Sequence, residues 1–135
     1  MFNKKKQPPI RSLIAEGSQI DGNFSSSDGL RVDGAIVGNL YGKPDLASIL
    51  VISESASVTG EIHADHIIIN GTVKGQVHAR FMLELQPKAR IEGDVHYTAL
   101  EMHQGALIAG QLRPIVGTEE KPTLKLAANN SALNS

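Results

Sequence analysis

The stretch Ile67-Ile-Ile-Asn-Gly-Thr-Val-Lys-Gly-Gln-Val77 decides the fold, because every second residue in it is either apolar or glycine. Its second half has the form apolar-x-Gly-x-apolar, and the apolar pair Ile67/Ile69 precedes that half. Alternation with a period of two is typical of a strand with one buried face, whereas a helix needs apolar residues at spacings of three and four. We therefore interpret the stretch as short strands joined by a turn.

The same apolar-x-Gly-x-apolar motif occurs six times along the chain. Its copies span 20–24, 36–40, 58–62, 73–77, 91–95 and 108–112, with glycines at Gly22, Gly38, Gly60, Gly75, Gly93 and Gly110. An apolar pair precedes most copies, namely Leu30/Val32, Leu50/Ile52, Ile67/Ile69, Leu83/Leu85 and Leu100/Met102, whereas the first copy has Ile14 alone. The step from the end of a pair to the start of its motif is four or six positions and never odd.

An even step keeps every apolar position on the same side of the strands, since an odd step would turn the side chains to the other face. Units that each bury one face and stack on their neighbours form a solenoid with one continuous core. The sequence therefore predicts an all-β solenoid of about six coils over 12–112. The repeat glycines fall at inward-facing positions, where they either relieve crowding or permit a bend at a corner.

Composition and charge narrow the function classes. The 135 residues include no Cys and no Trp, which excludes disulfide scaffolds, thiolate metal sites and Cys nucleophiles. The formal net charge of −1 is unlike that of a strongly basic nucleic-acid-binding domain, so we expect no nucleic-acid partner. The charge is uneven, at +4 over 1–11, −6 over 12–112 and +1 over 113–135. We expect 1–11 to be a basic flexible tail and 113–135 a disordered tail, which leaves 12–112 as the domain.

The six phased repeats with short tails resemble the bactofilins, and the opening Met1-Phe2-Asn3-Lys4 is similar to the Met-Phe-x-Lys start of bacterial members. The resemblance implies a right-handed parallel β-helix that polymerises end to end without nucleotide or other cofactor. It implies a membrane-associated bacterial cytoskeleton that organises cell shape and scaffolds cell-wall enzymes, so peptidoglycan synthases or hydrolases are the expected partners. It also favours like-to-like rather than head-to-tail junctions.

The two ends of such a solenoid carry unpaired backbone groups and a slice of apolar core. Because the tails lack an amphipathic pattern that could cover these ends, we expect copies to join through them into an open filament. The residues expected at the N-terminal end are Leu13, Ile14, Ile20 and Phe24, and those expected at the C-terminal end are Leu100, Met102, Leu107, Ile108 and Leu112. The alternative is that the tails fold over the ends and leave a monomer.

The N-terminal tip combines an aromatic residue with a cationic cluster. Met1, Phe2, Lys4, Lys5 and Lys6 are the expected membrane-binding residues. Lysines near an anionic leaflet contribute roughly 1 kcal/mol each, and burial of Phe2 adds about 1.5–3 kcal/mol, which is marginal for one copy. Many copies on a filament would hold the membrane firmly. We therefore expect a cytoplasmic protein peripheral to the inner membrane; an ordinary solvated basic terminus is the alternative.

Three histidines, His63, His78 and His96, follow the motif directly in consecutive copies. Neighbouring strands lie about 4.8 Å apart, so these residues should form a ladder on the surface. An exposed ladder without further function is the first interpretation. Metal binding and a pH effect on assembly are the alternatives.

Two other function classes compete with a structural polymer. A left-handed β-helix acyltransferase uses a His as general base, but its coils keep a strict six-residue period that this chain breaks repeatedly. A monomeric β-solenoid adaptor that binds a partner along one face is compatible with the same repeats. We expect a protein that is not an enzyme and has no catalytic residues.

Overall fold

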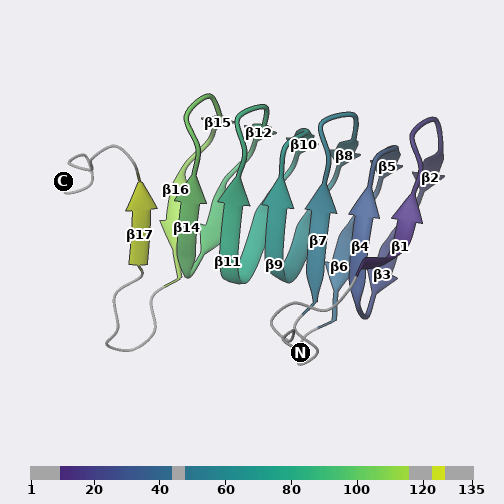
Figure 1. The fold of residues 1–135 in the computed structure, drawn as a ribbon, viewed down its shortest axis with the longest axis horizontal. Helices are drawn as coiled ribbons and strands as arrows, with labels where there is room; N and C mark the ends of the chain where they lie inside the picture. The colour runs from purple at the N-terminus through teal and green to yellow at the C-terminus, as the bar shows by residue number, and fades with distance from the viewer. Residues whose placement is uncertain (1–9, 44–47, 116–122, 127–135) are drawn as a thin grey trace, which may run out of the picture.

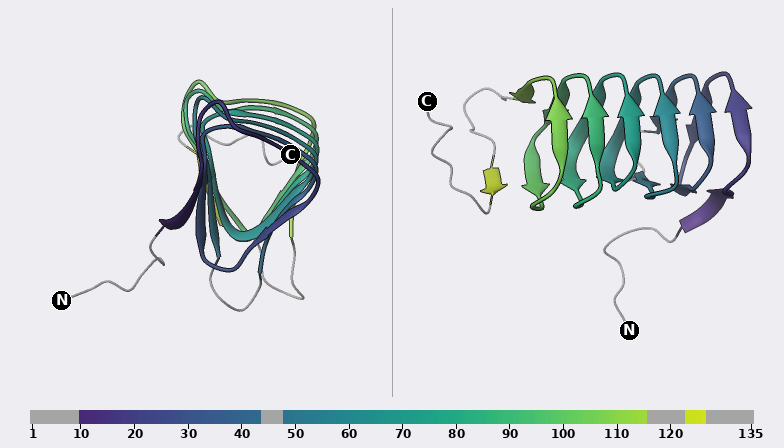
Figure 2. Two further views of the ribbon diagram at one scale, coloured as in Figure 1. Left: turned by 90° about the vertical axis from the view of Figure 1, so that its right-hand side faces the viewer. Right: turned by 90° about the horizontal axis from the view of Figure 1, so that it is seen from above.

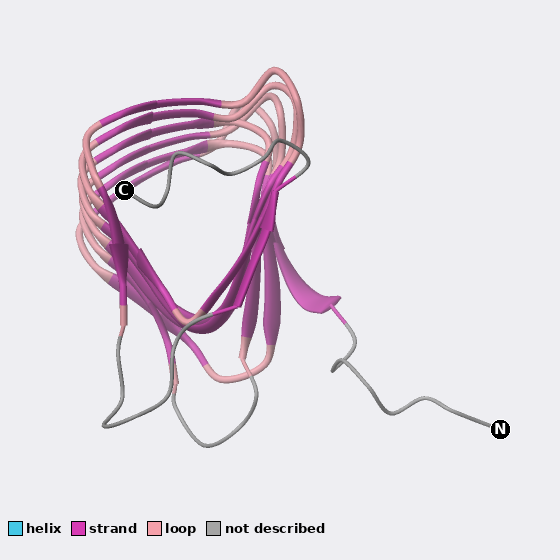
Figure 3. Cartoon of the chain, turned by 90° about the vertical axis from the view of Figure 1, so that its left-hand side faces the viewer, coloured by secondary structure: helices cyan, strands magenta, loops and turns pink. Residues whose placement is uncertain are grey.

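The computed structural model describes residues 10–43, 48–115 and 123–126. These described residues form seventeen strands and no helix. The strands wind into a solenoid with three faces, which Figure 2 shows end-on and from above and Figure 3 shows from the opposite end. Strands of one face run upward in Figure 1 while the chain advances from right to left and returns behind them, so the coil is right-handed. The predicted all-β right-handed parallel solenoid is confirmed.

Each coil contributes one strand or half-strand to each face. Face A contains β1 (Ile10–Ile14), β4 (Gly29–Val32), β7 (Ile49–Ile52), the second halves of β9 (Ile62–Ile69) and β11 (Val77–Leu85), and β14 (Ala99–Met102). Face B contains β2 (Gln19–Asp21), β5 (Ala35–Val37), β8 (Ser57–Thr59), β10 (Thr72–Lys74), β12 (Arg90–Glu92) and β15 (Leu107–Ala109). Face C contains β3 (Phe24–Ser26), β6 (Leu40–Gly42), the first halves of β9 and β11, β13 (Val95–Tyr97) and β16 (Leu112–Pro114).

All pairings are parallel and connect equivalent positions of consecutive coils. On face A, for example, Leu50 pairs with Leu30 on one side and with Ile67 on the other. The core therefore consists of columns of like residues, and its fully buried members include Leu30, Ile36, Leu40, Leu50, Ile52, Val58, Ile62, Ile67, Ile69, Val73, Val77, Leu83, Leu85 and Val95. These are the residues that the even spacing predicted to point inward.

The turn from face A to face B explains the two step lengths of the sequence. It holds two residues at 33–34 and 70–71, and four residues at 15–18, 53–56, 86–89 and 103–106. Both lengths are even, so the phase of the side chains survives every turn. The predicted six coils agree with the observed ones, although β1 begins at Ile10, two residues before the predicted boundary.

The repeat glycines occupy the corner between faces B and C. Gly60 has a φ of +149°, and a Cβ added to it would lie 2.0 Å from the carbonyl oxygen of Gly38 in the coil below. Both roles suggested by the sequence therefore apply, since the corner requires a left-handed backbone conformation and also leaves no room for a side chain. The glycine column sets how closely the coils stack at this edge.

Candidate functional site: the two ends of the solenoid

The N-terminal end is the first coil, made of β1, β2 and β3. Within the described residues each of these strands pairs on one edge only, with β4, β5 and β6 respectively. The core column positions of this coil are Ile14, which is nearly buried, and Ile20 and Phe24, which are half-buried. The first coil thus presents a row of backbone N–H and C=O groups around the open end of an apolar core.

The C-terminal end is the sixth coil, made of β14, β15 and β16. Its core column positions differ in exposure: Leu100 is 0% exposed, Ile108 and Met102 are half-buried, and Leu112 is 41% exposed. The outer edges of β15 and β16 have no partner strand among the described residues, because β15 pairs with β12 and β16 with β13 alone. The apolar core is therefore open on faces B and C of this end.

A strand lies within the range that the sequence analysis expected to be a disordered C-terminal tail. β17 (Thr123–Leu126) runs parallel to β14 on face A, and its residues pair with positions 99–102. The physical reason is the free edge of β14, whose backbone groups gain partners when an extended segment lies beside them. The Thr-Leu-Lys-Leu sequence of this segment suits a strand but is too short to stand out from composition alone.

Two of the residues expected at the ends do not belong to the core columns. Leu13 pairs with Arg31 and Leu107 with Arg90, both of which lie in outward-facing columns. Each leucine is 58% exposed and lies on the side of its end coil. Both leucines adjoin core positions in the sequence, but adjacent residues of a strand face opposite ways, so neither side chain points into the core.

A polar column next to the repeat glycines, which was not predicted from the sequence, also reaches both ends. The side-chain oxygen of Asn23 accepts a hydrogen bond from the backbone N–H of Asn39 at 2.9 Å, and Asn39 does the same for Glu61 at 2.9 Å. Asp94 accepts from the backbone N–H of Gln111 at 2.9 Å in the last coil. Polar residues directly after the motif glycine were the available signal. The column ties consecutive coils together at the corner.

The residues that form the coils are also the ones that identify the protein family. The model of the bactofilin family, described as polymer-forming cytoskeletal proteins, matches residues 12–113, which is more than half of the chain. The chain belongs to the bactofilin family. It is also 25% identical over 111 residues to bactofilin BacO of Myxococcus xanthus, an alignment that covers 82% of this chain and 85% of that protein. No solved structure matches it.

The histidine ladder of this bactofilin lies on the outer side of face C. The ring of Tyr41 stacks on His63 at 5.4 Å between centroids, His63 stacks on His78 at 5.3 Å, and His78 stacks on His96 at 4.7 Å. Burial lowers the pKa of His78, and the neighbouring His96 and His63 lower it further because a second positive charge beside them is unfavourable. Protonation of His78 at the centre of the ladder is therefore less favourable than protonation of an isolated histidine.

Ligand geometry separates this ladder from a metal centre. Among the described residues, one group of three side chains has its possible metal-ligand atoms within 4.8 Å of one another. This group is Glu84, Glu101 and His103, and it includes no histidine of the ladder. In that group His103 Nε2 lies 3.2 Å from a carboxylate oxygen of Glu84 and 3.6 Å from one of Glu101. His103 of the sixth coil already contacts Glu84 of the fifth coil, which ties these two coils together.

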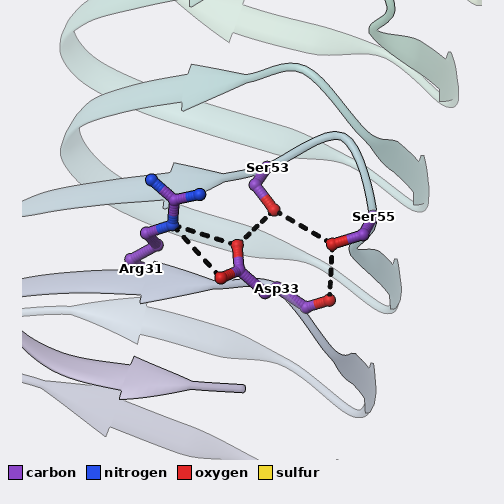
Figure 4. Close-up of polar contacts among 4 residues, drawn as sticks. All are labelled: Arg31, Asp33, Ser53 and Ser55. Atoms are coloured by element: carbon purple, nitrogen blue, oxygen red, sulfur yellow. Dashed lines mark hydrogen bonds and ion pairs between the residues drawn. The ribbon is translucent and has the colours of Figure 1, made fainter. Parts of the chain in front are cut away.

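A polar network on the turns between faces A and B links the second and third coils (Figure 4). Arg31 Nε donates to both carboxylate oxygens of Asp33, at 3.0 and 3.3 Å, and Ser53 donates to Asp33 from the coil above. Ser55 donates to the backbone oxygen of Asp33 at 3.0 Å. The hydrogen bond from Ser53, followed by the contact with Arg31, lowers the pKa of Asp33.

The expected membrane-binding residues Met1, Phe2, Lys4, Lys5 and Lys6 lie outside the described residues. In the part of the chain that is described, no helix is long and apolar enough to cross a bilayer.

Proposed function

We propose that this bactofilin assembles end to end, without nucleotide, into filaments that form a cytoskeletal scaffold at the cytoplasmic face of the bacterial inner membrane. The observation that carries the proposal is the state of the two ends, where strand edges and apolar core open together. Stacking a second copy pairs those edges and covers that core. Because the junction does not close a ring, repeated stacking gives a filament.

The exposed apolar side chains give the junction a favourable free energy. Full burial of a leucine contributes about 1.5–3 kcal/mol, so covering the exposed 41% of Leu112 contributes roughly 0.6–1.2 kcal/mol. Ile108 and Met102 on this end, and Ile20 and Phe24 on the other, add to it because they are only half-buried. Pairing of the free strand edges supplies directional backbone hydrogen bonds and fixes the register of the two copies.

The membrane and partner roles rest on the sequence. The tip at 1–6 carries Phe2 and three lysines, whereas the solenoid region is acidic, so an anionic leaflet attracts the tip. A filament presents one tip per copy, and this multiplicity turns weak single contacts into stable attachment. Cell-wall synthases or hydrolases positioned along such a scaffold would connect the filament to cell shape.

The test is sedimentation and negative-stain microscopy of the purified chain without nucleotide, comparing two matched variants. Leu112→Glu places a charge on the open core of the C-terminal end. Leu107→Glu makes the same change in the same coil, but on the outward side opposite Arg90, where the new carboxylate finds a cation. We expect filaments from the parent and from Leu107→Glu and none from Leu112→Glu. Equal filament formation by both variants would contradict association through the end of the core.

A further inference from the structure

β17 forms a partial seventh rung on the solenoid. It pairs with β14 in parallel, in the same direction as every coil below it, but it lies on face A alone. In Figure 1 it stands beside β14 as the last arrow of the row, at the C-terminal end. It therefore occupies the backbone edge that a joining copy would need on this face.

The register of β17 matches the rung on which it lies. In backbone register, Lys125 pairs with Glu101, which in turn pairs with Glu84, so a basic residue follows two acidic residues in this column of the sequence. Leu124 and Leu126 pair with Leu100 and Met102, which stand in the two core columns of face A. The alternation of the segment thus agrees with the column pattern at all three positions, in charge as well as in polarity.

The burial of core residues at the C-terminal end also differs between the face that β17 covers and the other faces. Leu100, on the face where β17 lies, is 0% exposed, whereas Leu112, on face C, is 41% exposed although both stand in core columns of the last coil. Among the described residues, β17 thus covers the edge of face A at Leu100, although Met102 on the same face stays half-buried, whereas no strand covers faces B and C. At the N-terminal end each strand of the coil has a free edge within the described residues.

We propose that the segment Thr123–Leu126 is a detachable cap of the C-terminal end, which competes with a second copy of the chain for the edge of β14. The inference rests on the proposed end-to-end assembly. One strand edge bonds one partner at a time, so a copy that stacks on this end with full pairing must displace β17. Residues 116–122 tether the cap, so it competes at a high effective concentration however dilute the protein is.

The cap gives the C-terminal end a threshold, whereas among the described residues no such strand lies on the N-terminal end. A strand of four residues is held by few pairs, so it is released readily and leaves the end competent to join. Any partner that bound the Thr-Leu-Lys-Leu segment in its released form would favour assembly, whereas a partner that held it on β14 would suppress assembly.

The experiment measures the critical concentration for sedimentation of the full chain, of a chain ending at Ile115, and of Lys125→Glu. We expect the critical concentration to fall about threefold to tenfold in the truncated chain, and in the same direction in Lys125→Glu, which puts a third acidic residue in register with Glu101 and Glu84. The double variant Glu101→Lys/Lys125→Glu, which restores opposite charges, should return toward the parent value. Lys121→Glu is the matched control, because it makes the same charge change outside β17.

A second measurement does not depend on filaments. Below the concentration at which the parent assembles, hydrogen exchange of the amides at 99–103 should be faster in the truncated chain than in the full chain. Equal critical concentrations in the full and truncated chains, or weaker assembly after truncation, would overturn the cap while leaving end-to-end assembly intact. Failure of both chains to assemble at any concentration would instead overturn the proposed function, and the cap with it.

Discussion

The corner glycines allow the strain of the backbone to be measured separately from the crowding between coils. Gly22 has a φ of +128°, but a Cβ added there meets no atom within 4 Å because no coil lies below it. Gly110 has a φ outside the left-handed range, but its Cβ would lie 2.1 Å from the carbonyl oxygen of Gly93. Gly60 combines both features, with a φ of +149° and a contact of 2.0 Å.

Alanine at these three positions should therefore destabilise the fold by different amounts. A left-handed conformation of a non-glycine residue costs about 1–3 kcal/mol, which is the expected loss for Gly22→Ala. Overpacking costs roughly 1–3 kcal/mol, which is the expected loss for Gly110→Ala. Gly60→Ala suffers both, so its free energy of unfolding should fall by about 2–6 kcal/mol, comparable with the roughly 5–15 kcal/mol of a whole domain.

The assay is urea unfolding followed by far-ultraviolet circular dichroism, with all chains below the concentration at which the parent assembles. If Gly60→Ala does not fold, the other two variants still report the separate contributions. A loss for Gly22→Ala as large as that for Gly60→Ala would refute the argument that the coil below restricts this corner. No loss for Gly110→Ala would show that the coils can separate at little cost.

Three further outcomes follow from the network, the ends and the tip. The lowered pKa of Asp33 means that its contribution to stability is present above the unfolded pKa of about 3.9 and is lost as the pH falls through the folded pKa. Asp33→Asn should thus lower the urea midpoint at pH 7 and lower it progressively less as the pH falls below the unfolded pKa, and a deficit that did not change with pH would contradict this. For like-to-like junctions, Leu112→Glu and Phe24→Glu should each form dimers alone, as measured by light scattering, whereas dimers found only in their mixture would indicate head-to-tail junctions. Replacing Phe2 by Gln, or its three neighbouring lysines by Gln, should release the parent filament from anionic liposomes in a flotation assay, and unchanged flotation would count against the anchor.

The architecture could be predicted from the sequence because each coil repeats the same alternation of inward-facing and outward-facing residues. The even steps between Ile52 and Val58, or between Ile69 and Val73, fix which residues point inward, and stacking then follows from burial of one face. The turn lengths could vary between two and four residues without disturbing that phase. These turns account for even differences in the length of the repeat, and the one-residue register shift between Ala79 and Met82 shows that the corner between faces C and A can absorb an odd one, so a repeat of 15 to 22 residues still produced a regular set of columns.

The ends were harder to predict, because they are where the repeat stops constraining the chain. Leu13 and Leu107 are apolar, but they alternate with the inward-facing residues of their strands and therefore lie on the outer surface. A count of apolar residues near each end does not take this alternation of faces into account. Tyr97, the last residue of β13, is buried. It lies in a core column whose other members include small residues such as Ala64 and Ala79. The strand at Thr123–Leu126 depends on the free edge of β14, a feature of the assembled coil rather than of the local sequence.

The corner between faces C and A has a practical consequence. Between the paired positions Ala79/Ala64 and Met82/His66, β11 holds two residues where β9 holds only Asp65, so the register shifts by one residue, yet Ala79 before the shift and Leu83 after it are both buried. This corner tolerates odd differences in length that would shift the phase of the core elsewhere. A fluorophore-bearing residue or a short affinity tag inserted beside Phe81, whose side chain is already exposed, should leave the core intact and mark every copy along an assembled fibre, at alternating short and long intervals where the junctions are like to like.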